Sequence, residues 1–436
     1  MIVLAPDSGV IRVINVLFVV PSEVSSGEAI TALHVAECLA AKGGRMHFLA
    51  SDFTAYFLEG PFPRGVTRFT QDRDSNCQIW LDLIRDFVPD LILFADYPLL
   101  FFSSGAPPFA GDAWASSLES LDIPLVTFDH LGYAQRPVSI YFGPPHLSFH
   151  CETLRAAPAN MHILLPCPVQ EPGFVPGRRG IPFRYWDLPL KLPEAKRQAV
   201  RRRYLRDERG MLVFHSTPGW AWRLAQNLGL PYYTFLSKIF ETYFSGLDVP
   251  VTILSINDGD LLAPCEHAGI HIRNLASLPK DEYEALMLAS DLMITENRLS
   301  VSLGKAVCGM VPGAVLRNSY RLRELLAFAE EPMRRILLEM EGERLGAVFP
   351  YEVFPIFGRQ EMELLGLYTH NSLDEAFATL EVFGGEATRA QLHRLLLDPE
   401  AQEAVRSKQQ DYANRLQSLE DAYDALQVVL EKQLVQ

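Results

Sequence analysis

Short apolar runs alternate with amphipathic segments through the first half of the chain. Five runs have the length of a β-strand and adjoin turn-forming Pro, Gly or Asp residues: residues 14–20, 46–50, 91–95, 125–128 and 162–165. Apolar residues at helical spacing fill residues 29–40, between the first two runs. Strands that are apolar on both faces are typical of a parallel sheet covered by helices. The pattern therefore predicts a doubly wound α/β lobe.

The same alternation begins again after residue 205. Strand-length runs cover residues 211–215, 251–255, 271–274, 292–295 and 313–316, and helical patterns cover residues 194–205, 281–290 and 302–308. Residues 170–193 are rich in Pro, Gly and aromatic residues, which predicts an irregular linker or an excursion over a cleft between two lobes. Apolar positions at helical spacing from about residue 399 to residue 434 predict a closing pair of amphipathic helices.

These patterns divide the chain into four predicted parts. They are a first lobe of residues 1–170, a linker or excursion of residues 171–205, a second lobe of residues 206–395, and C-terminal helices of residues 396–436. Ligands of open parallel sheets bind beyond the carboxyl ends of the strands. The residues just after each strand are therefore the candidates for a site.

Composition and charge narrow the class of protein. The 436 residues carry 39 Lys and Arg against 53 Asp and Glu, a formal net charge of −14, which disfavours binding to nucleic acid. No apolar run approaches the ~20 residues that cross a bilayer, and no basic segment precedes an apolar one at the N-terminus. We therefore expect a cytoplasmic protein without a membrane span. The six cysteines form no CxxC pair, so reduced thiols are expected and no metal site is predicted.

Polar residues follow the predicted strand of residues 292–295. Glu296 and Asn297 stand at its carboxyl edge, and Ser300 and Ser302 stand where the next helix begins. Hydroxyl groups at this position cap a helix, and the free N–H groups of its first turn can hold a phosphate. A plain helix cap in a satisfied polar turn is the alternative interpretation.

The sequence around these residues resembles the donor-binding half of the GT-B glycosyltransferases. The matching positions are Leu278, Pro279, Tyr283, Leu286, residues 289–291, the loop 296–302, Gly309 and Pro312. The resemblance implies that Glu296, Asn297, Ser300, Ser302 and Lys305 contact a nucleotide-activated sugar. One position departs from the family pattern: the carboxylate that binds ribose, eight positions after the Glu296 equivalent, is Gly304 here. The spacing from Gly309 to Pro312 is also one residue longer than usual.

Another turn in the predicted second lobe resembles the strand-to-helix turn of GT-B glycosyltransferases that faces the donor phosphates. The strand of residues 211–215 enters the turn Ser216, Thr217, Pro218, Gly219, and a helical segment with Trp220 and Trp222 follows. Backbone N–H groups of such a turn can cradle an anion. Trp220 is a candidate for stacking on a base or sugar, although both tryptophans also suit a packed core.

The first lobe supplies the candidates for catalysis and for the acceptor side. Ser26, Gly27 and Glu28 follow the first strand, where ordinary helix capping is an equal alternative. Asp96, Asp129 and His130 follow later strands and are the candidates for the base that takes a proton from an acceptor hydroxyl, and His34 is a competing candidate. His130 also suits a structural turn. Residues 60–74 and 101–114 are the expected acceptor loops, and residues 347–358 match the family's donor-sugar loop weakly.

The resemblance implies a fold and a function together. The expected fold is α/β, with two Rossmann-like, doubly wound parallel-sheet lobes facing a cleft and C-terminal helices. The expected function is transfer of a sugar from a nucleotide-sugar donor to an unknown acceptor, without a metal or other cofactor. Two alternatives remain: a catalytically silent ligand- or partner-binding protein, which Gly304 favours, and a nucleotide-sugar epimerase. The sugar, the nucleotide base, the stereochemistry and the oligomeric state are not determined by the sequence.

Overall fold

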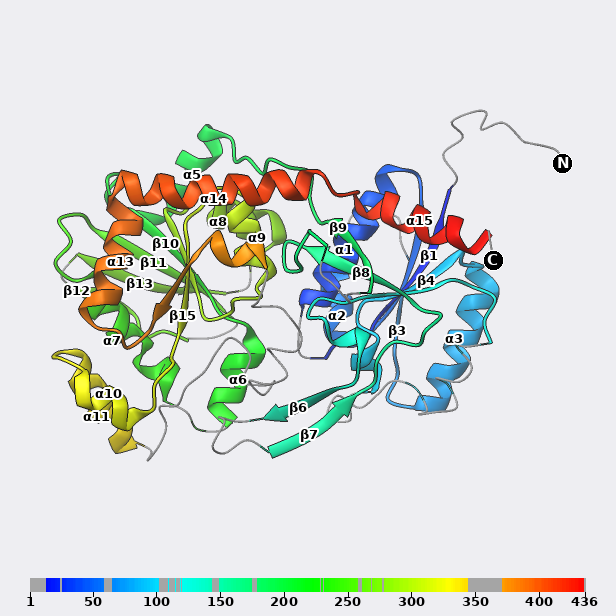
Figure 1. The fold of residues 1–436 in the computed structure, drawn as a ribbon, viewed down its shortest axis with the longest axis horizontal. Coiled ribbons are helices and arrows are strands. Elements are labelled where there is room, and N and C mark those ends of the chain that lie inside the picture. Colours follow the sequence, from blue (N-terminus) through cyan, green and yellow to red (C-terminus); the bar gives the residue numbers. More distant parts are fainter. Residues whose placement is uncertain are drawn as a thin grey trace.

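The chain forms two α/β lobes that lie side by side (Figure 1). This computed structural model describes residues 13–434 with several gaps. The gaps are residues 24–25, 59–64, 102–108, 110–113, 115–117, 119, 143–148, 175–178, 228, 230, 258–260, 268, 277 and 344–370. Among the described helices, none has both the length and the apolar character of a membrane-spanning helix.

The first lobe is built on a seven-stranded sheet in which every described pair of neighbours is parallel. The strand order is β3-β2-β1-β4-β5-β8-β9. The strands are β1 (Asn15–Val20), β2 (Arg45–Ala50), β3 (Gly65–Arg68), β4 (Leu91–Phe94), β5 (Leu125–Phe128), β8 (His162–Cys167) and β9 (Ile181–Arg184). The helical segments are α1 (Gly27–Ala41), α2 (Asp52–Leu58), α3 (Arg73–Phe87), and the 3-10 turns η1 (Pro98–Phe101) and η3 (Tyr133–Gln135). A separate antiparallel hairpin pairs β6 (Val138–Phe142) with β7 (Phe149–Leu154).

The second lobe repeats this arrangement and adds one antiparallel edge strand. Its order is β12-β13-β11-β10-β14-β15-β16. The strands are β10 (Met211–Ser216), β11 (Val251–Ile256), β12 (Cys265–His267), β13 (Ile270–Leu275), β14 (Leu292–Thr295), β15 (Gly313–Arg317) and β16 (Ala378–Glu381). The helical segments are α5 (Glu194–Tyr204), α6 (Gly219–Asn227), α7 (Tyr232–Phe244), α8 (Lys280–Ala289), α9 (Val301–Cys308), α10 (Leu322–Phe328), α11 (Met333–Glu343), η4 (Ser372–Glu375) and α13 (Glu386–Leu397).

Both sheets therefore share one topology. Successive strands are added toward one edge of the sheet and then, after one switch point, toward the other edge. In the first lobe this switch point lies between β1 and β4, and in the second it lies between β10 and β14. Loops that leave the carboxyl ends of two such strands diverge, which opens a crevice where ligands of this architecture bind. The candidate residues 26–28 and Asp96 adjoin the first switch point, and residues 216–220 and 296–302 adjoin the second.

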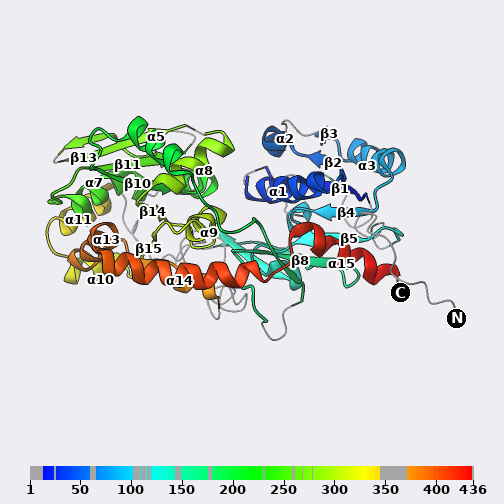
Figure 2. The ribbon, with the colours of Figure 1, turned by 90° about the horizontal axis from the view of Figure 1, so that it is seen from above.

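The last two helices connect the lobes a second time. Helix α14 (Pro399–Gln417) packs along the second lobe against α9 and α13, and α15 (Ala422–Leu434) lies on the first lobe against α1 and β9. Figure 2 shows both helices running along one flank of the molecule. Their apolar stripe fits the predicted amphipathic pair: Tyr412, Leu416, Leu426 and Leu430 are all buried.

The structure corrects one prediction about residues 170–193. This stretch was expected to be irregular, but it contains β9, which pairs with β8 and extends the first sheet. A strand of four residues interrupted by Pro182 gives no clear period in the sequence, and β9 has only one strand neighbour, where a missing N–H is tolerated. The short strands β3, β12 and β16 were missed because polar residues interrupt them and each is only partly buried.

Candidate functional site

At the second switch point, a buried carboxylate joins the two loops that leave β10 and β14. Thr217 follows β10, and its hydroxyl donates a hydrogen bond to Glu296, which follows β14. The hydroxyl of Tyr232 donates to the Oε1 atom of Glu296 at 3.3 Å. The carboxylate therefore fixes the turn after β10 against the loop after β14.

A buried histidine completes this group. The Nε2 atom of His215 lies 3.3 and 3.4 Å from the two carboxylate oxygens of Glu296, and its Nδ1 atom lies 2.9 Å from the Oγ atom of Ser255. His215 is fully buried and Glu296 is 7% exposed. Burial raises the pKa of Glu296, but the charge of His215 and the hydrogen bonds from His215 and Thr217 outweigh it, so the pKa is lowered. The carboxylate thus has several partners within its own lobe. A direct contact of Glu296 with a donor stays a prediction.

The predicted hydroxyl groups at the start of α9 are brought together by a tyrosine. The hydroxyl of Tyr283 donates to the Oγ atom of Ser302 at 2.9 Å and shares a hydrogen bond of 3.1 Å with the Oγ atom of Ser216. Ser300 is the N-cap of α9 and accepts from the N–H of Leu303 at 3.3 Å. The plain-cap interpretation therefore holds for Ser300, whereas Ser216 and Ser302 form one polar surface.

Three further donor-site candidates, Asn297, Gly219 and Trp220, belong to the loops that follow β14 and β10. The Oδ1 atom of Asn297 accepts from the N–H of Leu299 at 3.0 Å, as in an Asx turn. Gly219 begins α6, and Trp220 follows it inside the helix, but its side chain lies outside the described part. The predicted donor-sugar loop of residues 347–358 also lies outside the described residues, as do most residues of 102–113 and residues 60–64.

Gly304 allows the chain between the lobes to approach α9. A Cβ atom added at Gly304 would lie 2.2 Å from the Cγ atom of Pro168, which directly follows β8. Any larger residue, including a carboxylate, would collide with this proline unless the backbone moved. The departure from the family pattern at this position therefore coincides with a packing contact between the lobes.

Lys305, the next candidate, is buried at the same junction. Its Nζ atom donates to Glu284 on α8 and lies 5.0 Å from the ring centroid of Trp186. Burial lowers the pKa of Lys305, although Glu284 opposes this effect. The side chain is thus engaged between α8 and an aromatic residue that follows β9.

At the first switch point, two carboxyl groups lie close enough to influence each other. Asp96 is 1% exposed, accepts a hydrogen bond from the hydroxyl of Tyr133, and accepts from the N–H of Leu99 at 3.1 Å. Burial raises the pKa of Asp96 well above its ordinary value, and the charges of Glu28 and then Asp129 raise it further. Glu28 itself is half-buried at the start of α1. A proton is therefore held in this carboxyl cluster at a pH where an isolated Asp would have lost it.

Asp129 and His130 occupy the carboxyl end of β5. Asp129 is fully buried and accepts from the Nε2 atom of Gln135 at 3.2 Å; burial raises its pKa to about 6. Burial also lowers the pKa of His130 to about 4, so this imidazole is neutral at physiological pH. Its Nε2 atom is buried and makes no hydrogen bond with any residue that the structure describes.

The acceptor-side candidates stand at the start of α1, where Glu28 influences the carboxyl group of Asp96. Ser26 is the N-cap of α1, but its hydroxyl makes no capping hydrogen bond. The carbonyl of Gly27 accepts from the Oγ1 atom of Thr31 at 2.9 Å, and Thr31 is also hydrogen-bonded to the hydroxyl of Tyr185. The structure therefore brings residues 26–28 next to an aromatic residue of the inter-lobe segment.

An aromatic and charged junction connects the two switch points, and the sequence analysis did not predict it. The rings of Tyr185 and Trp186 stack with centroids 5.3 Å apart, and the Nε1 atom of Trp186 donates to the Nε2 atom of His34 at 3.3 Å. Lys280 at the start of α8 donates to both carboxylate oxygens of Glu37 on α1, at 2.9 and 2.8 Å. The density of aromatic residues in 170–193 was the available sequence signal.

The pKa of Glu37 reflects this cross-lobe pairing. Burial would raise it, but hydrogen bonds from His34 and Lys280 and their charges lower it to about 2. Since α8 begins beyond the carboxyl end of β13, and α1 begins beyond that of β1, the carboxyl edges of the two sheets face each other. Within the described residues, no group of three or more His, Cys, Asp or Glu side chains is arranged to hold a metal ion.

Comparison with solved structures identifies the fold. Similar structures include a glycosyltransferase from Rickettsia africae ESF-5 (10% identity, 97% of this chain and 98% of that chain covered, TM-score 0.53). They also include Anabaena Alr3699/HepE in complex with UDP-glucose (10% identity, 97% and 100% covered, TM-score 0.52). A third is the spinosyn rhamnosyltransferase SpnG with thymidine diphosphate (13% identity, 95% and 99% covered, TM-score 0.50). The molecule therefore has the GT-B fold, as the sequence predicted.

The sequence itself places the chain in a family. Residues 35–433 match the family described as "Family of unknown function (DUF6365)", and the chain belongs to this family. No curated protein matches the sequence.

Proposed function

We propose that the protein is a glycosyltransferase that moves a sugar from a nucleotide-activated donor to an acceptor hydroxyl. One observation carries this proposal. The carboxyl edges of the two sheets face each other, with a carboxyl cluster at one switch point and a hydroxyl-lined turn and helix start at the other. Fold alone does not define activity, so the argument rests on these two groups of residues.

In this proposal, the second lobe binds the donor. The first-turn N–H groups of α9 and those of the turn at residues 216–219 lie at the carboxyl ends of adjacent strands, β14 and β10. Both kinds of backbone donor bind phosphate oxygens and stabilise the charge that develops on a departing diphosphate. Ser216 and Ser302, joined by Tyr283, add hydroxyl donors. We propose that these groups act without a metal ion.

The first lobe supplies the base. Asp96 and Asp129 are 1% and 0% exposed, whereas Glu28 is half-buried and stands at the start of α1. A general base must come within hydrogen-bond reach of the proton that it takes. We therefore favour Glu28 as the base over the Asp96, Asp129 and His130 candidates. In the reaction, Glu28 accepts the acceptor's hydroxyl proton, the oxygen bonds to the anomeric carbon, and the bond from that carbon to the diphosphate breaks.

The test is thermal unfolding with a panel of UDP-, GDP-, dTDP- and CMP-sugars and the free nucleotides. A ligand present at about 100 times its Kd stabilises the folded state by about 2.7 kcal/mol. We expect one nucleotide class to raise the Tm, and we expect the rise to shrink in Ser302→Ala. Ser418→Ala is the matched control, because the Ser418 hydroxyl only donates to the carbonyl of Arg415 at the end of α14.

The activity is tested by following nucleoside diphosphate release by chromatography. Release of the diphosphate from the stabilising donor, with or without added acceptors, supports a transferase. If no nucleotide raises the Tm and no diphosphate is released, the proposal fails and a ligand- or partner-binding role takes its place.

A further inference from the structure

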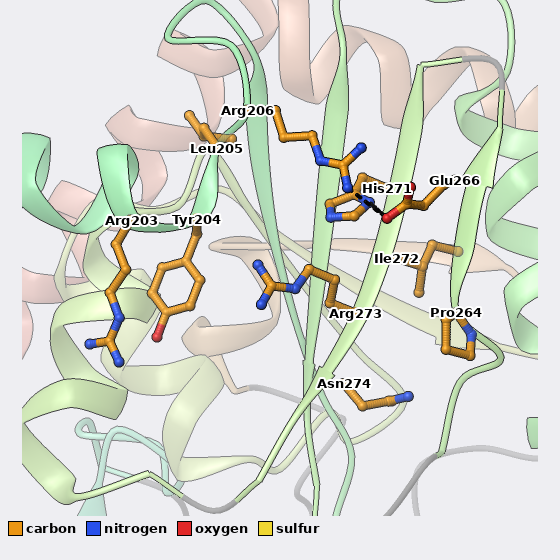
Figure 3. Close-up of a pocket in the computed structure, with 10 residues that line it drawn as sticks. All are labelled: Arg203, Tyr204, Leu205, Arg206, Pro264, Glu266, His271, Ile272, Arg273 and Asn274. Atoms are coloured by element: carbon orange, nitrogen blue, oxygen red, sulfur yellow. Dashed lines mark hydrogen bonds and ion pairs between the residues drawn. The ribbon is translucent and has the colours of Figure 1, made fainter.

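A cavity lies on the outer part of the second lobe, at the edge strand β12 and its neighbour β13. Its volume is about 420 Å³. It lies between the end of α5 and the β12–β13 hairpin, and Figure 3 shows the residues that line it: Arg203, Tyr204, Leu205, Arg206, Pro264, Glu266, His271, Ile272, Arg273 and Asn274. Cavities of this size accommodate small-molecule ligands.

The cavity runs along β13, from His271 near the start of the strand to Asn274, one residue before its carboxyl end. Strand register pairs Leu275 with Ile256 and Ile256 with Ser216 at the carboxyl edge, whereas His271 pairs with Thr252, four residues further back along the strand. At about 3.3 Å per residue, that places this end of the cavity about 13 Å below the edge. Strand β11 separates β13 from β10, so the cavity is lined by other strands than the one that leads to residues 216–219.

Arginine dominates the polar lining. Arg206 donates to Glu266 at 2.6 Å and Arg203 to Glu282 at 3.3 Å, and all four side chains are at least half exposed. Arg273 makes no ion pair with any residue that the structure describes. Exposed pairs of this kind contribute little to stability, so an incoming anion can recruit their arginines.

Of the other polar groups that line the cavity, Asn274 and His271 do not offer a positive charge to a ligand, whereas Arg273 does. Asn274 is engaged, because its side chain donates to the carbonyl of Leu262 at 2.6 Å and accepts from the N–H of the same residue at 3.1 Å. Burial, Arg206 and Arg273 lower the pKa of His271, so at neutral pH this imidazole does not add a positive charge. In Figure 3, Arg273 extends toward the ring of Tyr204, and Arg206 lies beside Glu266 and His271.

From this geometry we propose that the cavity is a binding site for a phosphate group, as free phosphate or as a small phosphate monoester, held by Arg273 and Arg206. The planar guanidinium group binds phosphate oxygens through paired N–H groups. The chain carries a net charge of −14, so its general surface repels anions, and a cavity with arginine on two sides is the place where an anion is retained.

The experiment is calorimetric titration of the full chain with inorganic phosphate and, separately, with glycerol 3-phosphate, at constant ionic strength. We expect saturable binding that weakens about tenfold or more in Arg273→Met, the loss of one charge-assisted interaction. Arg323→Met, an exposed position on α10, is the matched control and should bind like wild type. Whichever probe binds tighter distinguishes free phosphate from an ester.

Ser302→Ala separates this site from the proposed donor site. Binding that survives in Ser302→Ala and weakens in Arg273→Met supports the arginine site, whatever the fate of the proposed transferase activity. The proposal is overturned if neither probe binds saturably, or if Arg273→Met, verified as folded by its unfolding transition, binds both probes like wild type.

Discussion

A Cβ atom at Gly304 would lie 2.2 Å from the Cγ atom of Pro168, so the helix start in one lobe and the chain leaving the other are in direct contact. In the GT-B glycosyltransferase pattern that the sequence resembles, many members carry a carboxylate at this helix position. Here the space is filled by the proline, which is itself fixed because the hydroxyl of Tyr412 donates to its carbonyl. The contact between the lobes and the loss of the carboxylate are therefore two aspects of one packing arrangement.

Gly304→Ala should destabilise the protein. The added methyl group collides with Pro168, and overpacking of this kind costs about 1–3 kcal/mol. Urea unfolding measures the loss. Gly342→Ala is the control, because no atom lies within 4 Å of its added Cβ and the substitution lies inside α11, where Ala is favoured by about 1 kcal/mol. Equal stability of the two variants would contradict the contact.

Glu296→Gln should destabilise the protein most at neutral pH. The substitution removes a buried hydrogen-bond acceptor of Thr217, Tyr232 and His215, and leaving buried polar groups unsatisfied costs about 1–3 kcal/mol. The folded-state pKa of Glu296 is lower than its ordinary value of 4.5, so its stabilising contribution is present above that pH and is lost as the pH falls through the folded-state pKa. Urea unfolding of wild type and variant from pH 7 to pH 3.5 should therefore show a gap that narrows in acid. A gap that widens in acid would refute the pairing.

If Glu28 is the base, Glu28→Gln should reduce kcat by about 10²–10⁴-fold, since that is the usual contribution of general base catalysis. The Tm rise with the donor should persist, because Glu28 belongs to the opposite lobe. Glu23→Gln is the matched control: Glu23 is an exposed acid in the same loop after β1. A comparable loss in both variants would point to a general charge effect instead of a base at residue 28.

Trp186→Leu should weaken the coupling of the two lobes. Trp186 is 8% exposed, stacks on Tyr185 and contacts His34 and Lys305. Truncation of a buried aromatic residue costs about 3 kcal/mol or more. We expect urea unfolding followed by circular dichroism to separate into two transitions. Trp222→Leu, on α6 within the second lobe, should keep the wild-type shape of the curve, and identical curves for both variants would argue against a junction at Trp186.

The main strands and the two doubly wound lobes were predictable because they follow from local patterns, whereas the strand order and the switch points are known from the structure. The apolar run of residues 292–295 between turn residues indicates a buried strand, and Ser300 before a helical pattern indicates an N-cap. Strands β3 and β9 were missed because they are only partly buried and are not apolar runs, unlike the equally short β14, and Pro182 hides β9 further.

The side-chain junction could not be predicted from one sequence. Trp186 contacts His34 across 152 positions of chain, and Lys280 contacts Glu37 across 243. Such pairs depend on how two lobes pack, which no local period encodes. For the same reason, the contact of Glu296 with His215 was not predicted, and its contact with a donor stays a prediction.

Helix α15 has a consequence for how the protein is synthesised. The apolar cluster under α1 in the first lobe includes Ala425, Leu426, Val429 and Leu430, which come from α15. The first lobe therefore lacks part of its interior until the second lobe has been translated. Protein synthesis proceeds at about 5–20 residues per second, so the apolar face of α1 stays uncovered for on the order of ten seconds or more before α15 is made. During that interval the nascent first lobe exposes the apolar surface that α15 covers in the folded protein.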